Sequence, residues 1–550
     1  MPSAAVVAPV VLPLLAALLM TGFGYAGADL GRLAAAVGSW ASVGALFAVW
    51  VPVRSSIELT LGPLGFGSSF DLRVDGVTFA FGLMVALPTA VLLTIQPRPW
   101  PQAVLALLGL ASALAAVEAG GVVLTAIAGG TAATLAMVLL DTENPRAMRP
   151  SWAMLLAGWL ALAWFGVVLQ VGGGTAVYSA VPVATVTGPL FVLLAVSAVL
   201  AASLLPWRGW PSTLWSRPSL RGAGITVATL YPLGFYLLVR AYELGDGRYP
   251  HPLFNVLLAV IGIGAAFAAA VRAQAAETRR DFLAEVVPST GGFALMAIAV
   301  GTPLGLVAGL ILITAGSILV AAVALAPEDA GVGSLVVVAA AVGLPPSITF
   351  AALVVGIEAT FEAGDFIGLI GVAAAATWAV WMVAGARAIG LPGGRARPPD
   401  DSSSRVAPVI GLIALVAGPA LAALKVGYAD PVTAEVMQPS GLTPSASLVN
   451  VVTVSSVLPA LTLLAPVLLI GLAAYVIAGT SAIRVQPRPA VFMAPGANAI
   501  ARVRKAARSA AVPEQYRSIV NFKALEAAAA GGRPVLWFGA LVALAFAVTR

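Results

Sequence analysis

The chain has 550 residues, of which 60% are hydrophobic and 9% are charged, with a mean hydropathy of +1.00 and a formal net charge of +6. Apolar runs long enough to cross a bilayer recur along its length, which is typical of an all-α polytopic membrane protein. The longest polar stretches, residues 387–406, 428–446 and 481–532, are too short for an independent soluble domain, so no catalytic chemistry is expected in this chain.

No cysteine and a single histidine, His251, occur in the sequence. A disulfide, an iron–sulfur cluster and a conventional zinc site all need such side chains, so we expect this chain to bind no metal or other cofactor. We expect the lipid bilayer to surround the chain, and we predict no nucleic-acid partner. The first apolar segment lacks a basic flank and is interpreted as a span, not as a signal peptide.

The apolar segments predict about 16 transmembrane helices. Residues 331–361 are too many for one straight crossing and include Pro345 and Pro346, so we expect two half-helices there. Residues 447–480 are also too many, and this segment is expected to bend or to continue beyond the bilayer. The predicted spans cover residues 4–24, 33–53, 76–97, 101–117, 121–140, 150–172, 186–205, 222–240, 252–271, 283–301, 303–326, 331–361, 366–386, 406–424, 447–480 and 534–549.

The distribution of basic residues predicts the topology. Most of the 29 Lys and Arg residues lie in loops that follow odd-numbered spans, and the other face holds only Arg54, Arg73, Arg240, Arg248, Lys425 and Arg550. The positive-inside rule places the odd loops in the cytoplasm and both termini outside. We therefore expect a multi-pass protein of a bacterial-type inner membrane.

Two segments outside the spans have recognisable patterns. Residues 56–74 alternate apolar and polar side chains around a Gly-rich turn, which predicts an external β-hairpin, with an irregular loop as the alternative. Residues 497–529 are rich in Ala, Arg and Lys with interspersed apolar residues. This pattern predicts a basic amphipathic helix on the cytoplasmic surface, interrupted at Pro513, with a solvated linker as the alternative.

Four short motifs follow one another in a fixed order: PWRGW at 206–210, YPLGFYLLVR at 231–240, RRDFLAEVVPSTGGF at 279–293 and GLPPSITF at 343–350. Their order resembles the antiporter-like subunit family, which includes L, M and N type subunits of respiratory complex I, Mrp-type cation/proton antiporter subunits and membrane subunits of group 4 hydrogenases. The family has a broken helix ending in P-F-H-x-W-L-P and a second break at G-L-P-P-x-x-G-F.

This resemblance implies helix breaks at Pro206 and at Pro345–Pro346. The segment leading into Asp75-Gly76-Val77 is also similar to the family's R-x-D-G-L-S. The likeness covers about residues 56–390 and implies two inverted repeats. The resulting division is an N-terminal part with the hairpin (1–97), a first repeat (98–240), a second repeat (241–390), extra C-terminal helices (391–480), a cytoplasmic amphipathic segment (481–532) and a last span (533–550).

The family's proton relay is said to use a Glu on the fifth helix, a Lys on the broken seventh, a Lys on the eighth, a His or Lys on the eleventh, and a Lys or Glu on the broken twelfth. Buried Lys can serve there because desolvation lowers its pKa toward neutrality. None of the matching positions here is ionisable, and only Arg280 keeps a basic residue, at a helix entrance. The positions, called the relay positions below, are Ala128 (or Gly129), Ala201, Pro232, Gly316 and Leu353.

The remaining charges are each predicted to lie near the end of a span, away from the midplane. Glu285 lies close enough to Arg280 along one helix to form an interfacial ion pair. Arg240 and Glu243 are expected to pair or to extend toward the interface. The other charges interpreted as terminal are Glu118, Glu358 with Glu362, and Lys425.

The sequence therefore favours a structural or coupling subunit of a complex I-like, hydrogenase-like or Mrp-like assembly, packed beside homologous antiporter-like subunits and other membrane subunits. The alternative is an active H⁺ or Na⁺ channel whose pathway has moved to Glu285, Glu358 and Arg240, with Arg280 and Glu118 as further candidates. A third class is an unrelated secondary transporter with inverted repeats.

Overall fold

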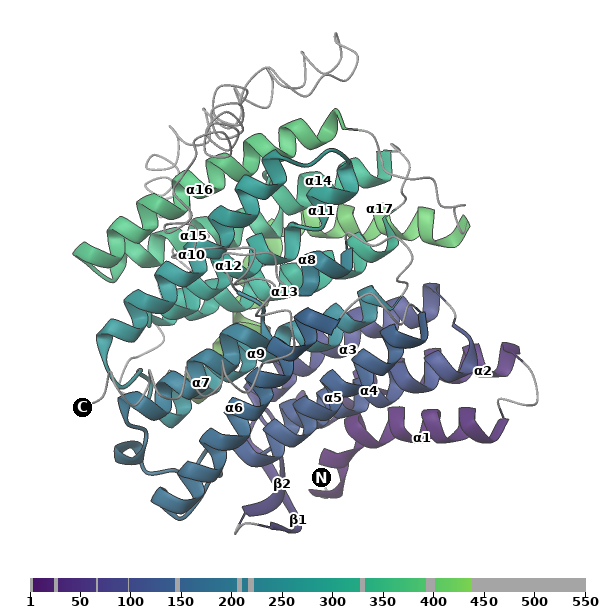
Figure 1. Ribbon diagram of the computed structural model, residues 1–550, viewed down its shortest axis with the longest axis vertical. Helices are drawn as coiled ribbons and strands as arrows, with labels where there is room; N and C mark the ends of the chain where they lie inside the picture. The colour runs from purple at the N-terminus through teal and green to yellow at the C-terminus, as the bar shows by residue number, and fades with distance from the viewer. Residues whose placement is uncertain are drawn as a thin grey trace, which may run out of the picture.

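The computed structural model of the chain shows helices packed side by side and, among the residues it describes, one two-stranded sheet (Figure 1). Eleven described helices are long and apolar enough to cross a membrane. The predicted all-α polytopic fold is thereby confirmed. The spans predicted at 447–480 and 534–549 and the amphipathic segment lie outside the described residues. The structure describes residues 3–23, 28–65, 68–96, 98–143, 149–204, 210–215, 222–326, 332–391 and 401–437.

The N-terminal part contains the predicted hairpin, in which Ile57 pairs with Val74 and Leu59 with Leu72 in antiparallel register. The hairpin leads directly into α3, whose first turn is capped by the Asp75 carboxylate accepting from the Thr78 amide at 2.8 Å. The elements are η1 (Ser3–Val7), α1 (Ala8–Phe23), α2 (Ala28–Trp50), β1 (Ile57–Gly65), β2 (Ser68–Val74) and α3 (Gly76–Ile95).

The next crossings include the first helix break, which falls between α7 and α8 as the motif around Pro206 predicted; Pro206 itself lies outside the described residues. The helix after it, α9, is enclosed by protein along its whole length. The elements are α4 (Trp100–Glu118), α5 (Val122–Glu143), α6 (Arg149–Gly173), η2 (Val183–Thr185), α7 (Gly188–Ala201), α8 (Trp210–Trp215) and α9 (Ala223–Leu244).

A second series of crossings contains the second predicted break, at Pro345 and Pro346. Proline has no amide hydrogen, so the helix stops there, and Ser347 begins a new one by accepting from the Phe350 amide at 3.0 Å. The elements are α10 (Pro252–Gln274), α11 (Arg279–Leu283), α12 (Val286–Ala299), α13 (Pro303–Leu325), α14 (Val332–Val342), α15 (Ile348–Glu362) and α16 (Asp365–Ile389).

The last described segment corrects the prediction of one continuous span at 406–424. The Gly418 amide donates to the Pro346 carbonyl oxygen at 2.9 Å, and a Cβ at Gly418 would lie 2.3 Å from that oxygen, so only glycine fits this contact. The helix is interrupted there and continues to residue 437. Its pieces are α17 (Asp401–Val416), η3 (Gly418–Ala420), α18 (Leu421–Leu424), the π-helical η4 (Lys425–Ala429) and α19 (Asp430–Met437).

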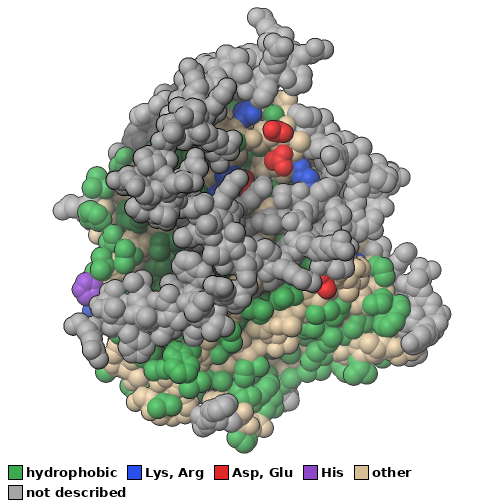
Figure 2. Space-filling model, viewed as in Figure 1, with side chains coloured by type: hydrophobic (Ala, Val, Ile, Leu, Met, Phe, Trp, Pro, Cys, Tyr) green, Lys and Arg blue, Asp and Glu red, His purple; other side chains and the backbone are tan. Residues whose placement is uncertain are grey.

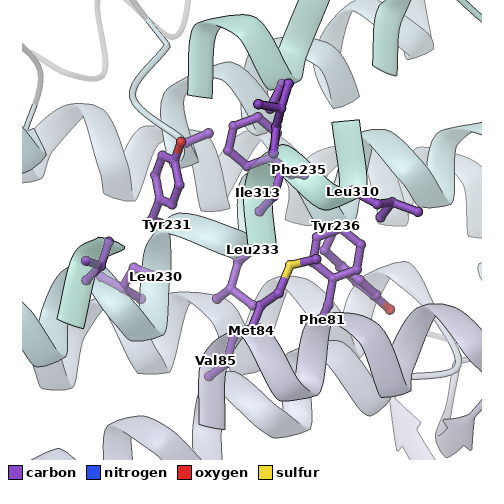
Figure 3. Packing of buried hydrophobic residues seen from close by; sticks show 14 of the residues in the cluster. Phe81, Met84, Val85, Leu230, Tyr231, Leu233, Phe235, Tyr236, Leu310 and Ile313 are labelled. Carbon is purple, nitrogen blue, oxygen red and sulfur yellow. The ribbon is translucent and has the colours of Figure 1, made fainter. Parts of the chain in front are cut away.

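The centre of the molecule is apolar. Figure 3 shows side chains of α3, α9 and α13 packed together, and the rings of Phe81 and Tyr236 meet edge to face at 5.7 Å between centroids. The outer surface is apolar as well: Leu18, Leu160 and Leu369 are each more than 60% exposed, and hydrophobic side chains cover much of the described surface in Figure 2. A chain that is apolar both inside and outside suits a bilayer as its solvent.

Candidate functional site

The five relay positions lie on α5, α7, α9, α13 and α15, inside the protein. Ala201 is fully buried and Leu353 is 2% exposed. A Cβ built on Gly316 would lie 3.4 Å from Thr290 Cγ2 and 3.8 Å from the Tyr231 ring. The Tyr231 hydroxyl, next to Pro232 in the chain, donates to the Val287 carbonyl at 3.0 Å. The surroundings of these positions are thus apolar and hydroxyl-lined.

Two hydroxyl groups that the sequence singles out as possible water ligands, Ser203 and Thr131, form local bonds. Ser203 Oγ accepts from the Trp210 amide at 3.1 Å, and Thr131 Oγ1 donates to the Ile127 carbonyl at 2.8 Å. Alcohol and phenol groups keep their proton at physiological pH, so they can order water but cannot store or switch a charge. The relay positions and these hydroxyls lack the chemistry of a proton relay.

Charge is instead concentrated at the base of the hairpin. Arg240 of α9 makes a two-pronged contact with Asp75, at 2.7 Å from Nη1 to Oδ2 and 3.0 Å from Nη2 to Oδ1. Arg240 Nη1 also donates to Glu243 Oε2 at 2.7 Å. Arg73 of β2 binds Asp75 Oδ2 through Nε at 2.9 Å and contacts Glu243 and Glu435. We call this group the hairpin ion cluster; its members are Arg73, Asp75, Arg240, Glu243 and Glu435.

The centre of the hairpin ion cluster is shielded from solvent, and Glu435, with 24% of its side chain exposed, is at the edge. Asp75 is fully buried and Arg240 is 1% exposed, and Arg240 lies 5.3 Å from the ring centroid of Tyr236, whose hydroxyl accepts from its Nε at 3.1 Å. Burial would raise the pKa of Asp75, but Arg240 and Arg73 outweigh it and hold the pKa below its ordinary value. Of the two roles expected for Arg240, pairing with Glu243 is confirmed.

Glu285 lies at the junction of α11 and α12 and is 2% exposed. Glu285 Oε2 accepts a hydrogen bond from Arg272 Nε of α10 at 2.9 Å. The expected partner, Arg280, instead donates through Nε to the Trp215 carbonyl at 3.0 Å. The expectation assumed one continuous helix, whereas α11 ends at Leu283 and α12 begins at Val286, with Glu285 in the turn between them. Glu285 is therefore an interhelical carboxylate.

Glu358 and Glu118 are terminal in their helices, as expected, but their surroundings differ. Glu358 lies one helical turn before Glu362, which is the last residue of α15. Glu118 ends α4 and is fully buried, and neither of its carboxyl oxygens has a hydrogen-bond partner among the described residues. A terminal position in the sequence therefore did not imply an exposed side chain.

Lys425, interpreted from the sequence as a charge at the end of a span, is buried by the surrounding protein. It is 7% exposed, on the π-helical η4 that follows the interruption at Gly418. Its Nζ lies 3.7 Å from Asp430 Oδ2. The sequence predicts only a polar stretch at residues 428–446, so it does not identify Asp430 and Glu435 as candidate site residues. The glycine next to proline at 418–419 was the available signal, because it marks a break after which a helix can resume.

Within the described ranges, no group of three His, Asp or Glu side chains lies close enough to hold a metal ion. The negative groups of the hairpin ion cluster are bound to arginines, which occupy the places that a cation would take. The chemistry that this arrangement offers is ion pairing between helices.

No protein-family model matches the sequence, and no curated protein matches it. The chain is similar to a chain of the Mrp complex from Dietzia sp. DQ12-45-1b, with a TM-score of 0.71 and 19% identity, over 100% of this chain and 63% of that chain. It is similar to a chain of respiratory complex I from Thermus thermophilus with bound NADH, with a TM-score of 0.66 and 18% identity, over 80% of this chain and 99% of that chain. It is also similar to a chain of the membrane-bound sulfane sulfur reductase, an archaeal respiratory membrane complex, with a TM-score of 0.63 and 17% identity, over 75% of each chain.

At these identities the likeness is one of fold, and it confirms the fold that the ordered motifs predicted. The chain spans 63% of the length of the Mrp chain, which is less than two thirds.

Proposed function

We propose that this chain is a membrane subunit of a larger ion-translocating assembly, in which it has a structural or coupling role and no complete proton relay at the relay positions. Its fold is that of chains from an Mrp complex, respiratory complex I and a sulfane sulfur reductase that is an archaeal respiratory membrane complex. Homologous antiporter-like subunits and other membrane subunits are the proposed partners.

One observation carries the proposal: Ala, Ala, Pro, Gly and Leu occupy the relay positions, in a fold otherwise shared with those complexes. A proton crosses a protein interior by binding to groups that can release it again, and these side chains cannot bind one. The charges that the described chain retains at the hairpin pair with one another and join helices. Their arrangement suits a subunit that holds an assembly together.

The proposal includes a location and an orientation. The chain belongs in a bacterial-type inner membrane, with the hairpin outside and the basic loops in the cytoplasm. Residues 497–529 would then lie on the cytoplasmic surface and contact neighbouring subunits. Cysteine labelling with a membrane-impermeant thiol reagent tests this, because the sequence has no native cysteine. A cysteine at Ser56 should react from outside and one at Ser509 only after the membrane is opened.

The function itself is tested by purifying the chain from its native membranes under mild detergent and identifying the partner chains by mass spectrometry. In the same membranes, Glu285→Gln and Glu358→Gln should leave ion transport by the assembly unchanged. Loss of transport in either variant would favour the alternative, an active subunit with a relocated pathway. Recovery of the chain without any partner would overturn the proposal and favour an independent secondary transporter.

A further inference from the structure

Lys425 and Asp430 lie on the interrupted helix that follows the second repeat, at positions that no motif singled out. η4 turns Lys425 and Tyr428 toward the protein, where they are 7% and 8% exposed, while Val426 between them is 62% exposed. A π-helical turn costs regular hydrogen bonding and occurs often at functional sites. The burial of Lys425 therefore needs an explanation other than a charge at the end of a helix.

Two contacts fix the depth of Lys425 in the protein. The interruption at Gly418 touches Pro346, at the break between α14 and α15. On the other side, Gly76, the first residue of α3, is packed against the backbone of Pro431. Lys425 lies about halfway between these two levels, roughly 10 Å along the helix from each. It is thus well inside the membrane-spanning part of the chain.

The same depth holds a relay position. Gln96 Nε2, just after α3, donates to the Ala324 carbonyl of α13 at 3.4 Å, so α13 runs away from the hairpin and α15 runs back toward it. Both α15 and the segment after Gly418 leave the contact with Pro346 in that direction, and η3 and α18 pack against α15. Leu353 is seven residues beyond Pro346 and Lys425 seven beyond Gly418. Lys425 therefore lies level with Leu353.

A second relay position is also near this level. The Tyr428 hydroxyl is 2.9 Å from Thr314 Oγ1 on α13 and donates to the Ala80 carbonyl at 3.2 Å. Thr314 is two residues from Gly316, so η4 reaches α13 at nearly the depth of Gly316, although Gly316 faces Thr290 and Tyr231 on the other side of α13. A lysine has thus been placed, from a different helix, at the depth of two positions that lack one.

The pair differs in chemistry from the hairpin ion cluster. Arginine keeps its proton under all physiological conditions, whereas a buried lysine can lose one. Asp430 is its ion-pair partner, with 3.7 Å between Nζ and Oδ2, and the Asp430 side chain is 32% exposed, so it has access to the outside of the chain that Lys425 lacks. One partner is enclosed and the other is open, which is the arrangement that a proton-exchange site needs.

We propose that Lys425, within the membrane-spanning part of the chain, and Asp430, near its outer edge, form a proton-exchange site. The proton moves from Lys425 Nζ to Asp430 Oδ2, so that an ammonium and a carboxylate become an amine and a carboxylic acid. Asp430 then gives its proton to a neighbouring group or to water, and Lys425 is reprotonated in turn. This inference rests on the proposed function, because an assembly that moves ions must supply the driving force.

The test compares variants of the whole assembly in native membrane vesicles, with proton translocation as the readout. Lys425→Met and Asp430→Asn should abolish proton translocation or its coupling to the driving reaction. Lys425→Arg is the decisive variant, because it keeps the ion pair but cannot release a proton. It should fail like Lys425→Met, whereas a merely structural pair would accept arginine. Glu58→Gln, at an exposed hairpin carboxylate, is the matched control and should translocate protons normally.

A measurement on the wild-type chain covers the case in which the variants do not assemble. Dicyclohexylcarbodiimide is an apolar reagent that modifies protonated carboxyl groups within membranes, and peptide mass spectrometry locates the product. Asp430 should be modified more at mildly acidic than at mildly alkaline pH, and more strongly still in Lys425→Met. Absence of modification at every pH would mean a permanently ionised pair and would overturn the site.

The outcomes separate this inference from the proposed function. If the assembly translocates protons and all the variants behave as wild type, the site is wrong and the proposed function stands. If the chain purifies without partners, the proposed function fails. Carbodiimide modification of Asp430 in that isolated chain then still decides whether the pair exchanges a proton.

Discussion

The hairpin ion cluster and the relay positions differ in how much charge they bury within the same chain. At the hairpin, five charged side chains from β2, α9, α19 and the residue before α3 meet in a space whose centre is shielded from solvent. At the relay positions, five sites on five helices carry no charge. The difference shows that the charges of the hairpin ion cluster join separate segments of the chain, whereas the relay positions are filled by uncharged side chains.

The energetic reason lies in the neighbours of each group. An ionisable group near the bilayer centre costs at least about 2.5–3.5 kcal/mol, so it persists only where it has a use. In the hairpin ion cluster every charge has a partner of opposite sign, and removing one leaves the others uncompensated. The uncharged residues at the relay positions, Ala, Pro, Gly and Leu, avoid this cost altogether.

The largest effect is expected from Arg240→Met. This change leaves Asp75 buried with only Arg73 as its cation and should cost about 3–5 kcal/mol of stability. Thermal unfolding in detergent, followed by intrinsic tryptophan fluorescence, measures it. Glu58→Gln is the control, since Glu58 is 53% exposed and 3.5 Å from Arg73, and should change stability by about 1 kcal/mol or less. An Arg240→Met protein as stable as wild type would show that the cluster does not hold the fold.

A charge placed at a relay position tests the other side of the comparison. Leu353→Lys should cost at least about 2.5–3.5 kcal/mol, because Leu353 is 2% exposed in apolar surroundings. Leu353→Met is the control and should cost about 1.5 kcal/mol or less. The yield of membrane-inserted protein and its melting temperature both report the cost. A Leu353→Lys protein as stable as the control would mean that water or a partner charge reaches this position.

Close backbone packing gives a smaller effect that needs no charge. A Cβ at Gly234 of α9 would lie 2.5 Å from the Ala202 amide nitrogen and 2.6 Å from the Ala198 carbonyl oxygen, and backbone cannot move aside as a side chain can. Gly234→Ala should therefore cost about 1–3 kcal/mol in thermal unfolding. At Gly316→Ala the nearest atom is a side-chain methyl at 3.4 Å, so this matched substitution should be nearly neutral. Equal costs for the two changes would refute the close contact between α7 and α9.

Acid should weaken the hairpin ion cluster slightly without any mutation. The pKa of Asp75 is held below its ordinary value of 3.8, so its ion pairs stabilise the fold fully above that pH and lose this contribution as the pH falls through the lower folded value. Burial and Asp75 raise the pKa of Glu435 above 4.5, so Glu435 adds no further change below that pH. The melting temperature should fall by a few degrees as the pH is lowered below about 3.8. An Asp75→Asn protein should not show this fall.

Local signals in the sequence were enough to predict most of this architecture. Apolar runs gave the spans up to residue 386, alternation gave the hairpin, and two adjacent prolines gave the break before α15. Each of these features is decided by residues close together in the chain. The order of the motifs allowed the fold itself to be predicted, because it related both helix breaks to those of the antiporter-like subunit family.

The ion pairs could not be predicted in this way, since their partners are far apart in the chain. Arg240 and Asp75 are separated by 165 residues, and Glu285 is held by a different helix from the one expected. The deep position of Lys425 depends on a contact between Gly418 and a carbonyl group on another broken helix. A polar residue after an apolar run looks the same in sequence whether the helix ends there or resumes.

The contact between Arg73 and Glu435 has a consequence for how the protein is made. The two residues are 362 positions apart, so a ribosome that adds 5–20 residues per second emits Glu435 roughly 20–70 s after Arg73. During that interval Asp75 and Glu58, which are synthesised with the hairpin, are the partners at hand for this guanidinium. The hairpin can therefore form with these early partners, and the contact between Arg73 and Glu435 is added only after the late segment has been synthesised.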